Sequence, residues 1–96
     1  MLEQIKAYKI ICDCCGKQYQ TINGFVCYLD DDDGSLIYAD AKGDGWVHTT
    51  SKEFVDGFEN VYHRHYCDKC YKHDKDNNIV TNDGHTYDGK THNEIS

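Results

Sequence analysis

The sequence has few of the aliphatic residues from which a hydrophobic core is built. Leu, Ile, Val and Phe together account for 18 of its 96 residues. A charged chain with so little of this content approaches the composition of disordered proteins. Eight tyrosines and Trp46 add apolar area, but a single domain of this length still has a small core. The composition therefore favours a fold that something besides the core stabilises, and a bound metal is one such means.

Long apolar segments are missing as well. No run approaches the ~20 apolar residues that a helix needs to cross a bilayer, and residues 1–6 contain no apolar signal-peptide core. We therefore expect a cytoplasmic protein that makes no membrane contact. In such a reducing compartment, cysteines serve metal binding or catalysis more often than disulfide formation.

Basic residues are outnumbered, since 10 Lys and Arg stand against 17 Asp and Glu and give a formal charge of −7. An acidic chain is not drawn to phosphate backbones by bulk attraction, so a protein partner is favoured over nucleic acid. The charge is nevertheless uneven: residues 63–75 carry a net charge of +2 and three histidines, whereas residues 30–44 carry −5. The basic segment 62–75, which also contains three tyrosines, leaves nucleic-acid binding through a local patch as an alternative.

Signatures of catalysis and of calcium binding are also lacking. The sequence has neither a Gly-rich phosphate loop nor a nucleophile elbow. A calcium loop that placed Gly34 at its sixth position would start with Leu29 instead of an acidic residue. A second candidate loop starts at Asp74 and continues with Asp76 and Asn78, but Ile79 stands at the position that requires glycine. We therefore expect that the protein is not an enzyme.

The sequence does have two Cys-x-x-Cys pairs, Cys12 with Cys15 and Cys67 with Cys70. The two-residue gap lets both sulfurs of a pair face one point, and two pairs supply the four thiolates of a closed tetrahedral zinc site. Gly16 follows the first pair, and glycine readily adopts the positive φ that such a turn often needs. The sequence therefore predicts one structural Zn²⁺ bound to these four cysteines, with a total charge of about −9 once the thiolates are counted.

Other assignments of these cysteines and their neighbours stay open. Disulfides and redox pairs are alternatives, although the βαβ setting of a thioredoxin-like motif is absent. Cys14 is expected to point away from the metal and Cys27 to be a small core residue. Either cysteine is an alternative ligand, and so is His73, because it follows Cys70 by three residues. His63 and His65 are expected on one face of a strand, where they would make a second candidate metal pair.

The predicted fold is a small zinc-stabilised α+β domain over residues 1–87, with antiparallel strands, one or two short helices and a flexible tail at 88–96. Strands are predicted at 4–11, 17–21, 25–29, 45–50, 61–66, 79–81 and 85–87, with hairpin turns at Asn23-Gly24 and Asp83-Gly84. Helices are predicted at 35–43 and at 71–75. Ser35 would be the cap of the first helix, and a strand at 36–38 is the alternative to it. Residues 30–35 are predicted to be a solvated acidic turn, residues 51–60 a loop or single turn, and Trp46 a core residue.

The segments Cys12-x-x-Cys15-Gly16-Lys17 and His65-Tyr66-Cys67-x-x-Cys70 resemble the zinc-ribbon and treble-clef group, over about residues 10–73. The Gly45-Trp46 strand upstream of the second segment also resembles small bacterial and phage proteins of unknown function. In the group, the second pair lies either in another knuckle or in the first turn of a helix. The 51 residues between the pairs exceed those of a minimal ribbon, so the resemblance implies inserted elements. It implies a metal-held scaffold and no particular activity.

We therefore expect a structural-zinc scaffold that acts as a protein-interaction module or as an accessory or regulatory factor. The first alternative is a nucleic-acid-binding zinc ribbon that uses segment 62–75. The second alternative is a thiol redox or metal sensor that uses the crowded sequence Cys12-x-Cys14-Cys15.

Overall fold

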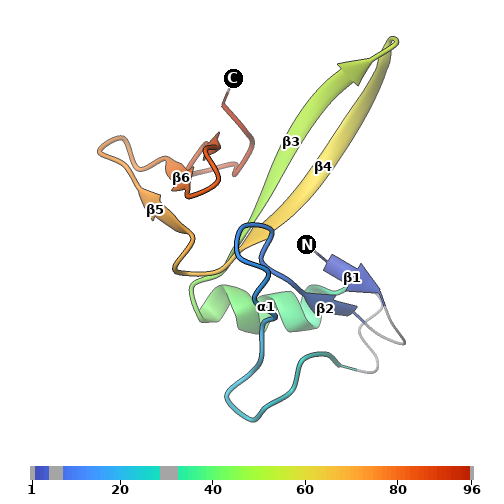
Figure 1. Ribbon diagram of the computed structural model, residues 1–96, viewed down its shortest axis with the longest axis vertical. Helices are drawn as coiled ribbons and strands as arrows, with labels where there is room; N and C mark the ends of the chain where they lie inside the picture. The colour runs from blue at the N-terminus through green and yellow to red at the C-terminus, as the bar shows by residue number, and fades with distance from the viewer. Residues whose placement is uncertain (1, 5–7, 29–32, 96) are drawn as a thin grey trace.

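The structure, a computed structural model, describes residues 2–4, 8–28 and 33–95. In this part of the chain it has one helix and antiparallel strands (Figure 1). The elements are, in order, β1 (Leu2–Gln4), β2 (Tyr8–Ile10), α1 (Ser35–Gly43), β3 (Val47–Val55), β4 (Phe58–Tyr66), β5 (Tyr71–His73), β6 (Ile79–Thr81) and β7 (Thr86–Tyr87). They form three separate sheets, β1–β2, β3–β4 and β5–β6–β7. One helix with antiparallel strands is the α+β arrangement that the sequence predicts.

The longest feature is the hairpin of β3 and β4, whose strands pair from Val47↔Tyr66 to Val55↔Phe58. It closes through Asp56 and Gly57, which have φ values of 52° and 82°. Two successive positive φ values match the twist of a tight hairpin turn, and Asp-Gly is a preferred pair in that turn. The loop predicted at residues 51–60 is therefore wrong, because these residues continue both strands. The sequence does not indicate the strands here, because these residues lack the polar–apolar alternation of a half-buried strand.

Only the base of this hairpin is packed against the rest of the molecule. In β3, alternate residues from Val47 to Ser51 are buried, and every residue from Lys52 to Val55 is exposed. In β4, the two buried residues are His65 and Tyr66, at the end of the strand. Figure 1 shows the outer half of the hairpin projecting away from the other elements. The hairpin is thus a ribbon that is anchored at one end.

Helix α1 closes the base of the hairpin. Its cap position is Gly34, rather than Ser35 as predicted, and the Asp33 carboxylate accepts a hydrogen bond from the Ser35 N–H at 3.0 Å. Ile37 and Ala41 are the buried residues of the helix, and they share a face because they are four residues apart. The helix at 35–43 is thus confirmed, and its apolar face points into the core.

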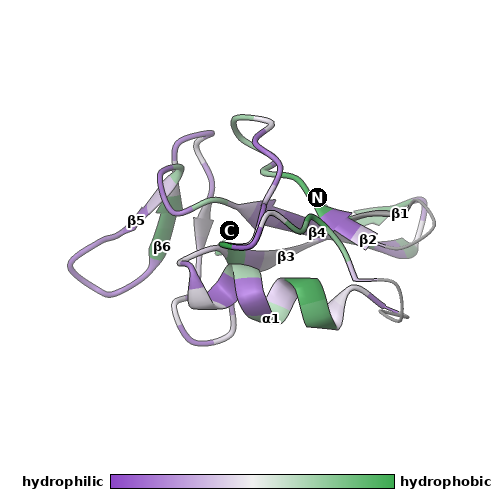
Figure 2. Cartoon of the chain, turned by 90° about the horizontal axis from the view of Figure 1, so that it is seen from below, coloured by the Kyte–Doolittle hydropathy of each residue, from purple (hydrophilic) through white to green (hydrophobic). Residues whose placement is uncertain are grey.

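The strands after residue 70 form a small sheet of their own. β6 lies between β5 and β7, and Ile79, Thr81 and Tyr87 are buried. In the hydropathy view, β6 is apolar, whereas β5 and the loop after it are hydrophilic (Figure 2). The predicted hairpin of residues 79–87 is confirmed. The helix predicted at 71–75 is wrong, because residues 71–73 pair with β6 as a strand.

Residues 88–95, which belong to the predicted tail, make backbone hydrogen bonds to both neighbouring sheets. The Thr50 N–H donates to the His92 carbonyl at 2.9 Å, and the Glu94 N–H donates to the Thr50 carbonyl at 2.8 Å. The Ile95 N–H donates to the Thr86 carbonyl at 2.9 Å. This segment therefore lies between β3 and β7. The division of the chain at residue 87 stays a prediction.

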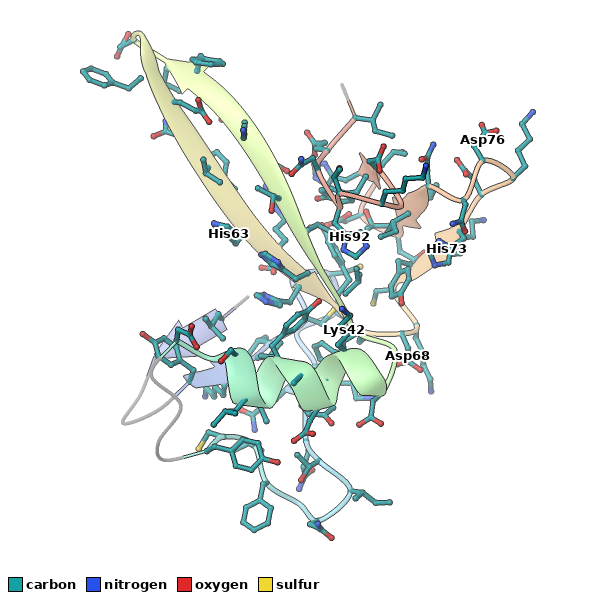
Figure 3. All side chains as sticks on the ribbon, turned by 180° about the vertical axis from the view of Figure 1, so that it is seen from behind. Lys42, His63, Asp68, His73, Asp76 and His92 are labelled. Carbon is teal, nitrogen blue, oxygen red and sulfur yellow. The ribbon has the colours of Figure 1, made fainter. Side chains whose placement is uncertain are left out.

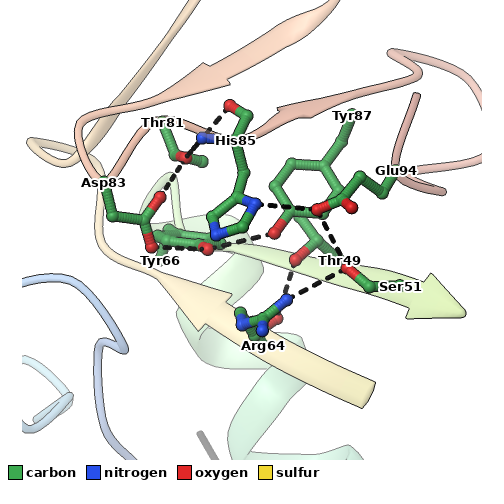
Figure 4. Close-up of polar contacts among 9 residues, drawn as sticks. All are labelled: Thr49, Ser51, Arg64, Tyr66, Thr81, Asp83, His85, Tyr87 and Glu94. Atoms are coloured by element: carbon green, nitrogen blue, oxygen red, sulfur yellow. Dashed lines mark hydrogen bonds and ion pairs between the residues drawn. The ribbon is translucent and has the colours of Figure 1, made fainter. Parts of the chain in front are cut away.

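A polar network joins the hairpin to the C-terminal sheet (Figure 4). The Tyr66 hydroxyl donates to the Asp83 carboxylate at 2.9 Å and lies 3.1 Å from the Tyr87 hydroxyl. Burial and these two bonds raise the pKa of Tyr66, so its hydroxyl stays protonated and remains a donor. Further hydrogen bonds and an ion pair connect Arg64, Ser51, Glu94 and His85. The network ties the base of the hairpin to strands that are distant in sequence.

In the described residues, no helix is both long and apolar enough to cross a membrane. The hydrophobic core of the protein lies where these elements meet. Its largest members include Ile10, Ile37, Tyr66 and Tyr87, each with no exposed surface. Trp46 is 4% exposed and packs edge-on against Tyr19, with ring centroids 5.5 Å apart. The prediction that Trp46 is a core residue is confirmed.

The strands predicted before the helix differ from those observed. The strand at 4–11 is replaced by the pair β1–β2, with Leu2 opposite Ile10; residues 5–7 lie outside the described residues. The segment 17–21 contributes only the isolated bridge Ile11↔Gln18. Residues 25–28 form no strand, and Phe25 is 57% exposed. None of the described strands pairs with this apolar run. Leu29 and most of the acidic turn, residues 29–32, lie outside the described part of the chain.

Candidate metal centre

The two Cys-x-x-Cys pairs meet at one point, although 51 residues separate them in the sequence. The sulfur atoms of Cys12, Cys15, Cys67 and Cys70 all lie within 4.8 Å of one another. Two of the separations are 3.4 Å, between Cys67 and Cys70, and 3.8 Å, between Cys15 and Cys67. Three of the four cysteines are buried and Cys15 is exposed. The structure therefore brings together the four cysteines that the sequence singles out, and we call them the four-sulfur cluster.

The first pair lies in a tight turn that follows β2. The Gly16 N–H donates to the Cys12 carbonyl at 2.9 Å, and the Cys12 N–H donates to the Lys17 carbonyl at 2.8 Å. Gly16 has a φ of 78°, which side chains with a Cβ rarely adopt, so glycine is the favoured residue at this position. The turn presents the sulfurs of Cys12 and Cys15 to the same point, as their spacing predicts.

The second pair lies in a turn between two strands. Cys67 directly follows β4, and Cys70 directly precedes β5. The Cys70 N–H donates to the Cys67 carbonyl at 3.1 Å and closes this turn. A strand rather than a helix follows Cys70, because residues 71–73 pair with β6. The chain therefore leaves the cluster in the same extended form in which it enters.

Hydrogen bonds join the two turns directly. The Asp13 N–H donates to the His65 carbonyl at 2.8 Å, and the His65 N–H donates to the Asp13 carboxylate at 2.8 Å. The Cys67 N–H donates to the Cys12 sulfur at 3.4 Å. Sequence reasoning missed the role of Asp13, because a residue inside the first turn carries no mark of the strand that it will contact. These bonds hold the four sulfurs together through the backbone.

The surroundings of the cluster favour ionisation of one thiol and oppose ionisation of two others. Burial acts to raise the pKa of Cys12, but hydrogen bonds from the backbone N–H groups of Cys67, Cys15 and Cys14 bring that pKa down to about 7. Burial raises the pKa of Cys67. Burial and the neighbouring sulfurs raise the pKa of Cys70. A divalent cation removes this conflict, because a metal that coordinates a thiol also deprotonates it.

The sulfur separations suit a tetrahedral metal site. Zn²⁺ binds thiolates at about 2.3 Å, which places the sulfurs of a tetrahedral site roughly 3.8 Å apart. The separations of 3.4 and 3.8 Å match this value and are much longer than a disulfide bond, which is about 2.05 Å. All six cysteines are free. A donor set made only of sulfur selects zinc or iron over magnesium and calcium.

The alternative ligands lie outside the four-sulfur cluster. Cys14 is half-buried and packs against the core. Burial and the sulfurs of the cluster raise the pKa of Cys70, and the Cys14 thiol is the smallest of the causes that do so. Cys27 is half-buried in a segment that is not a strand, so its predicted place in a central strand is wrong. His73 is exposed on β5.

Comparison with protein-family models, with curated proteins and with solved structures finds no match to the chain. The case for a function therefore depends on the four-sulfur cluster and on the surface that the fold presents.

Proposed function

We propose that the protein is a small zinc-ribbon-like scaffold, in which the four-sulfur cluster binds one structural Zn²⁺, and that it acts by binding another protein. The observation that carries the metal assignment is the convergence of four sulfurs within 4.8 Å of one another, with two of the separations at 3.4 and 3.8 Å, which fits tetrahedral thiolate coordination. Four thiolates fill the coordination shell of Zn²⁺ and leave no position for a reactive water. This supports a structural role for the metal and a protein that is not an enzyme.

The size of the core supports a structural role as well. Binding of structural zinc to four protein ligands is worth roughly 10–16 kcal/mol near neutral pH. The total stability of a small domain is about 5–15 kcal/mol. In a chain with 18 residues of Leu, Ile, Val and Phe, a contribution of that size decides whether the fold forms.

The exposed end of the β3–β4 hairpin supports a protein partner. Residues 54–58, which we call the hairpin tip, include Phe54 and Phe58, which are 73% and 75% exposed, and Val55, which is 42% exposed. Single exposed apolar residues are common, but several together mark interaction surfaces. Exposed aromatic residues are also the usual anchors of protein interfaces. Val55 and Phe58 are cross-strand partners and share one face of the tip, whereas Phe54 points to the other face. The tip therefore exposes apolar side chains on both of its faces, at a distance from the four-sulfur cluster.

The nucleic-acid alternative has less support. Within segment 62–75, His65 is 5% exposed and Tyr66 is fully buried, so neither ring is available to stack on a base. Arg64 donates to Ser51 at 3.0 Å and is committed to the fold. A two-stranded ribbon can enter the major groove of DNA, but residues 52–59 carry one lysine against three acidic residues. The charge of the ribbon therefore opposes that use.

Thiol-based sensing is the second candidate function, and the position of Cys14 favours it. Cys14 directly precedes Cys15, and its thiol is the smallest of the causes that raise the pKa of Cys70, so a spare thiol lies near the four-sulfur cluster. Oxidation by a peroxide can join such a thiol to a neighbouring ligand as a disulfide, which would release the metal. The test compares zinc release from the wild type and from Cys14→Ser at equal peroxide concentration, and equal rates would dismiss this candidate.

Metal analysis tests the zinc assignment. We expect one tightly held zinc per chain, no iron and none of the visible absorption of an iron–thiolate centre. Replacement of zinc by Co²⁺ should produce the charge-transfer bands of thiolate ligands in the near ultraviolet. Protein that contains no zinc after purification under reducing conditions, or that shows disulfides between the paired cysteines, would contradict the assignment.

A crosslinking comparison tests the protein partner. A photo-reactive amino acid at position 58 should yield discrete crosslinked protein bands in the native host, because the tip would contact the partner. The same group at position 72, on the exposed and hydrophilic strand β5, is the matched control and should yield none of those bands. Identical bands from both positions, or none from position 58, would argue against the hairpin tip as the binding surface.

A further inference from the structure

The outer half of strand β4 has a free edge on the side that faces away from β3. At the base of the strand, the N–H and the carbonyl of His65 both bond to Asp13, on that side. Backbone groups alternate in direction along a paired strand, so those of His63, Val61 and Glu59 also point away from β3. Within the described residues, β4 pairs with no strand except β3, and no hydrogen bond reaches these groups. The edge therefore has unpaired donors and acceptors at every second residue.

The corresponding edge of β3 is protected. The N–H of Thr50 donates to the His92 carbonyl at 2.9 Å, so the C-terminal segment covers this edge at the base. Farther out, Lys52 places a charge on the edge, which is a common means of preventing strands from pairing. Figure 3 shows His92 and His63 on opposite sides of the hairpin. Residues 59–63, on the β4 side, contain neither lysine nor proline, and their pairing has no bulge. The β4 edge therefore lacks the usual protection.

The side chains on this part of β4 are exposed and partly apolar. Residues 58–63 are all exposed, and the exposed fractions of Val61 and Tyr62 are 44% and 42%. An exposed edge strand with apolar side chains is a template for pairing with another chain. The outer half of the hairpin is a two-stranded ribbon, which is marginally stable in water, whereas sheets of three or more strands are stable on their own. Addition of a strand at the β4 edge therefore stabilises the ribbon.

A second copy of the chain fits this edge in one antiparallel register, in which a twofold axis passes between the two Val61 residues. Glu59 of each copy then lies opposite His63 of the other, and the free backbone groups of all three residues are paired. Moving the axis one residue toward the tip places His63 against the hairpin turn. Moving it one residue toward the base places Glu59 against His65, whose groups are already bonded to Asp13. Because a twofold axis makes such a contact self-complementary, this one register uses the whole free edge.

The side chains of the two copies complement one another in this register. The carboxylate of Glu59 lies beside the imidazole of His63, and the twofold axis makes this pair twice. Phe58 of one copy lies opposite Arg64 of the other, which allows a guanidinium to approach an aromatic ring. Opposite-charge and aromatic pairs directly across two strands stabilise a sheet, whereas like charges there destabilise it. A second copy therefore suits both the backbone and the side chains of the edge.

His63 has a ring nitrogen available for this contact. Its Nδ1 lies 2.9 Å from Nε2 of His48, which leaves its own Nε2 to donate to a carboxylate. His63 and His65 share a face of β4, as the sequence predicts, because they are two residues apart. The described residues bring three or more potential metal ligands together only at the four-sulfur cluster, and a metal role for these two histidines stays a prediction.

We propose that the protein forms a dimer in which the β4 edges of two copies pair about a twofold axis at Val61. The two hairpins then make one four-stranded antiparallel sheet, with a β3 strand at each outer edge and the two four-sulfur clusters at its opposite ends. This self-pairing is separate from the binding of another protein by the hairpin tip. Because the contact is a single pair of strands, it is small, and we expect a dissociation constant on the order of 100 μM.

Sedimentation equilibrium of the full chain, purified under reducing conditions, tests the dimer at protein concentrations from about 10 μM to about 1 mM, which bracket the expected dissociation constant. Val61→Pro should raise the dissociation constant by at least about tenfold, because it removes the central N–H donor from both copies. In the single chain this N–H faces away from β3, and proline is accepted on an edge strand in that orientation. The variant should therefore fold, and Trp46 fluorescence checks that it does.

Lys52→Pro is the matched control, because Lys52 is the cross-strand partner of Val61 and its N–H points outward on the β3 edge. This variant should dimerise like the wild type. A second comparison tests the register. His63→Glu should weaken the dimer by at least about threefold, because like charges then face each other across the axis. Adding Glu59→His to the same chain places unlike side chains opposite each other again and should restore the dimer.

Amide exchange over the same concentrations locates the contact. The amides of Glu59, Val61 and His63 should gain protection as the dimer forms, whereas that of Lys52 should not. A chain that stays monomeric over the whole range would overturn the proposal, and so would a dimer that Val61→Pro leaves intact or that both proline variants weaken equally. Protection of these amides only after addition of a host extract would assign the edge to another protein and would also overturn it.

The crosslinking comparison distinguishes this dimer from the binding of another protein at the tip. A crosslinked band from position 58 at twice the mass of the chain reports the dimer, because this position lies opposite the second copy. Bands of other masses report a host protein.

Discussion

The two halves of the β3–β4 hairpin share one continuous backbone pairing but differ in everything that surrounds it. At the base, Tyr66 has no exposed surface, and four residues earlier on the same face Tyr62 is 42% exposed. The backbone pairing runs through both halves without a break and ends at the Asp56–Gly57 turn. Hydrogen-bonded pairing therefore does not require burial at each residue pair. A two-stranded hairpin alone is marginal in water, so the outer half depends on the anchored base.

The base itself depends on contacts that are distant in the sequence. The Asp13–His65 bonds and the four-sulfur cluster tie it to the first turn, and the Tyr66–Asp83 bond ties it to the C-terminal sheet. Breaking these contacts should therefore affect the whole domain, whereas changes in the outer half should stay local.

The largest effect is expected from Cys67→Ser. The substitution leaves three thiolates and a weaker fourth ligand, so zinc affinity should fall by orders of magnitude and the fold should be lost with it, since structural zinc is worth roughly 10 kcal/mol or more. A strong chelator should do the same to the wild type. The measurement is Trp46 fluorescence together with amide dispersion. If the apoprotein keeps native dispersion and melts cooperatively at a similar temperature, the core alone is sufficient.

Next in size is the contrast between Tyr66→Ala and Tyr62→Ala, the same change in one strand. Tyr66→Ala should destabilise by about 3–5 kcal/mol, as is typical for a large buried aromatic. Tyr62→Ala should lower the free energy of unfolding by less than about 1 kcal/mol. This value includes the loss of the contact with Arg64, whose guanidinium lies 5.9 Å from the ring centroid of Tyr62. Urea unfolding of both zinc-loaded variants gives the two values. Similar losses would show that base and outer half are not distinct.

A smaller effect on stability is expected at the hairpin tip. Phe58→Ser removes a side chain that is 75% exposed, so the free energy of unfolding should change by no more than about 0.5 kcal/mol. The same substitution should remove the crosslinks from a photo-reactive group at position 54, if the tip binds a partner. A loss of stability comparable to that of Tyr66→Ala would mean that the tip is packed in solution.

The smallest effects are expected from Cys14→Ser and Cys27→Ala. Neither sulfur belongs to the four-sulfur cluster, so each variant should keep a full equivalent of tightly bound zinc. Metal analysis after gel filtration measures this directly. Loss of zinc from either variant would show that the ligand set includes a different cysteine.

The sequence identifies the parts of this fold that have local signals. The helix from Ser35 and the hairpin around Asp83-Gly84 follow from turn residues and periodicity, and the four cysteines follow from their spacing. The outer half of the β3–β4 hairpin was missed because a strand with solvent on both faces has no alternation to detect. Its one available signal was Asp56-Gly57, which is the same turn pair that located the later hairpin.

The remaining errors come from contacts that no local pattern encodes. Residues 25–28 are apolar enough for a central strand, but no strand in the described part of the chain pairs with them. Residues 71–73 became a strand because β6 offers an edge beside them. Similarly, the sequence placed His63 with His65, but only the register of β3 against β4 could add His48.

The absence of a loop between β4 and the second cysteine turn has a mechanical consequence. Cys67 is the residue immediately after Tyr66, the last residue of β4. Nine residue pairs at about 3.3 Å each make a lever arm of roughly 30 Å between the hairpin tip and this point. A sideways load at Phe54 or Phe58 therefore acts as a torque about the base, and the Cys67 sulfur lies beside the pivot. Force applied at the tip reaches the four-sulfur cluster through the backbone alone.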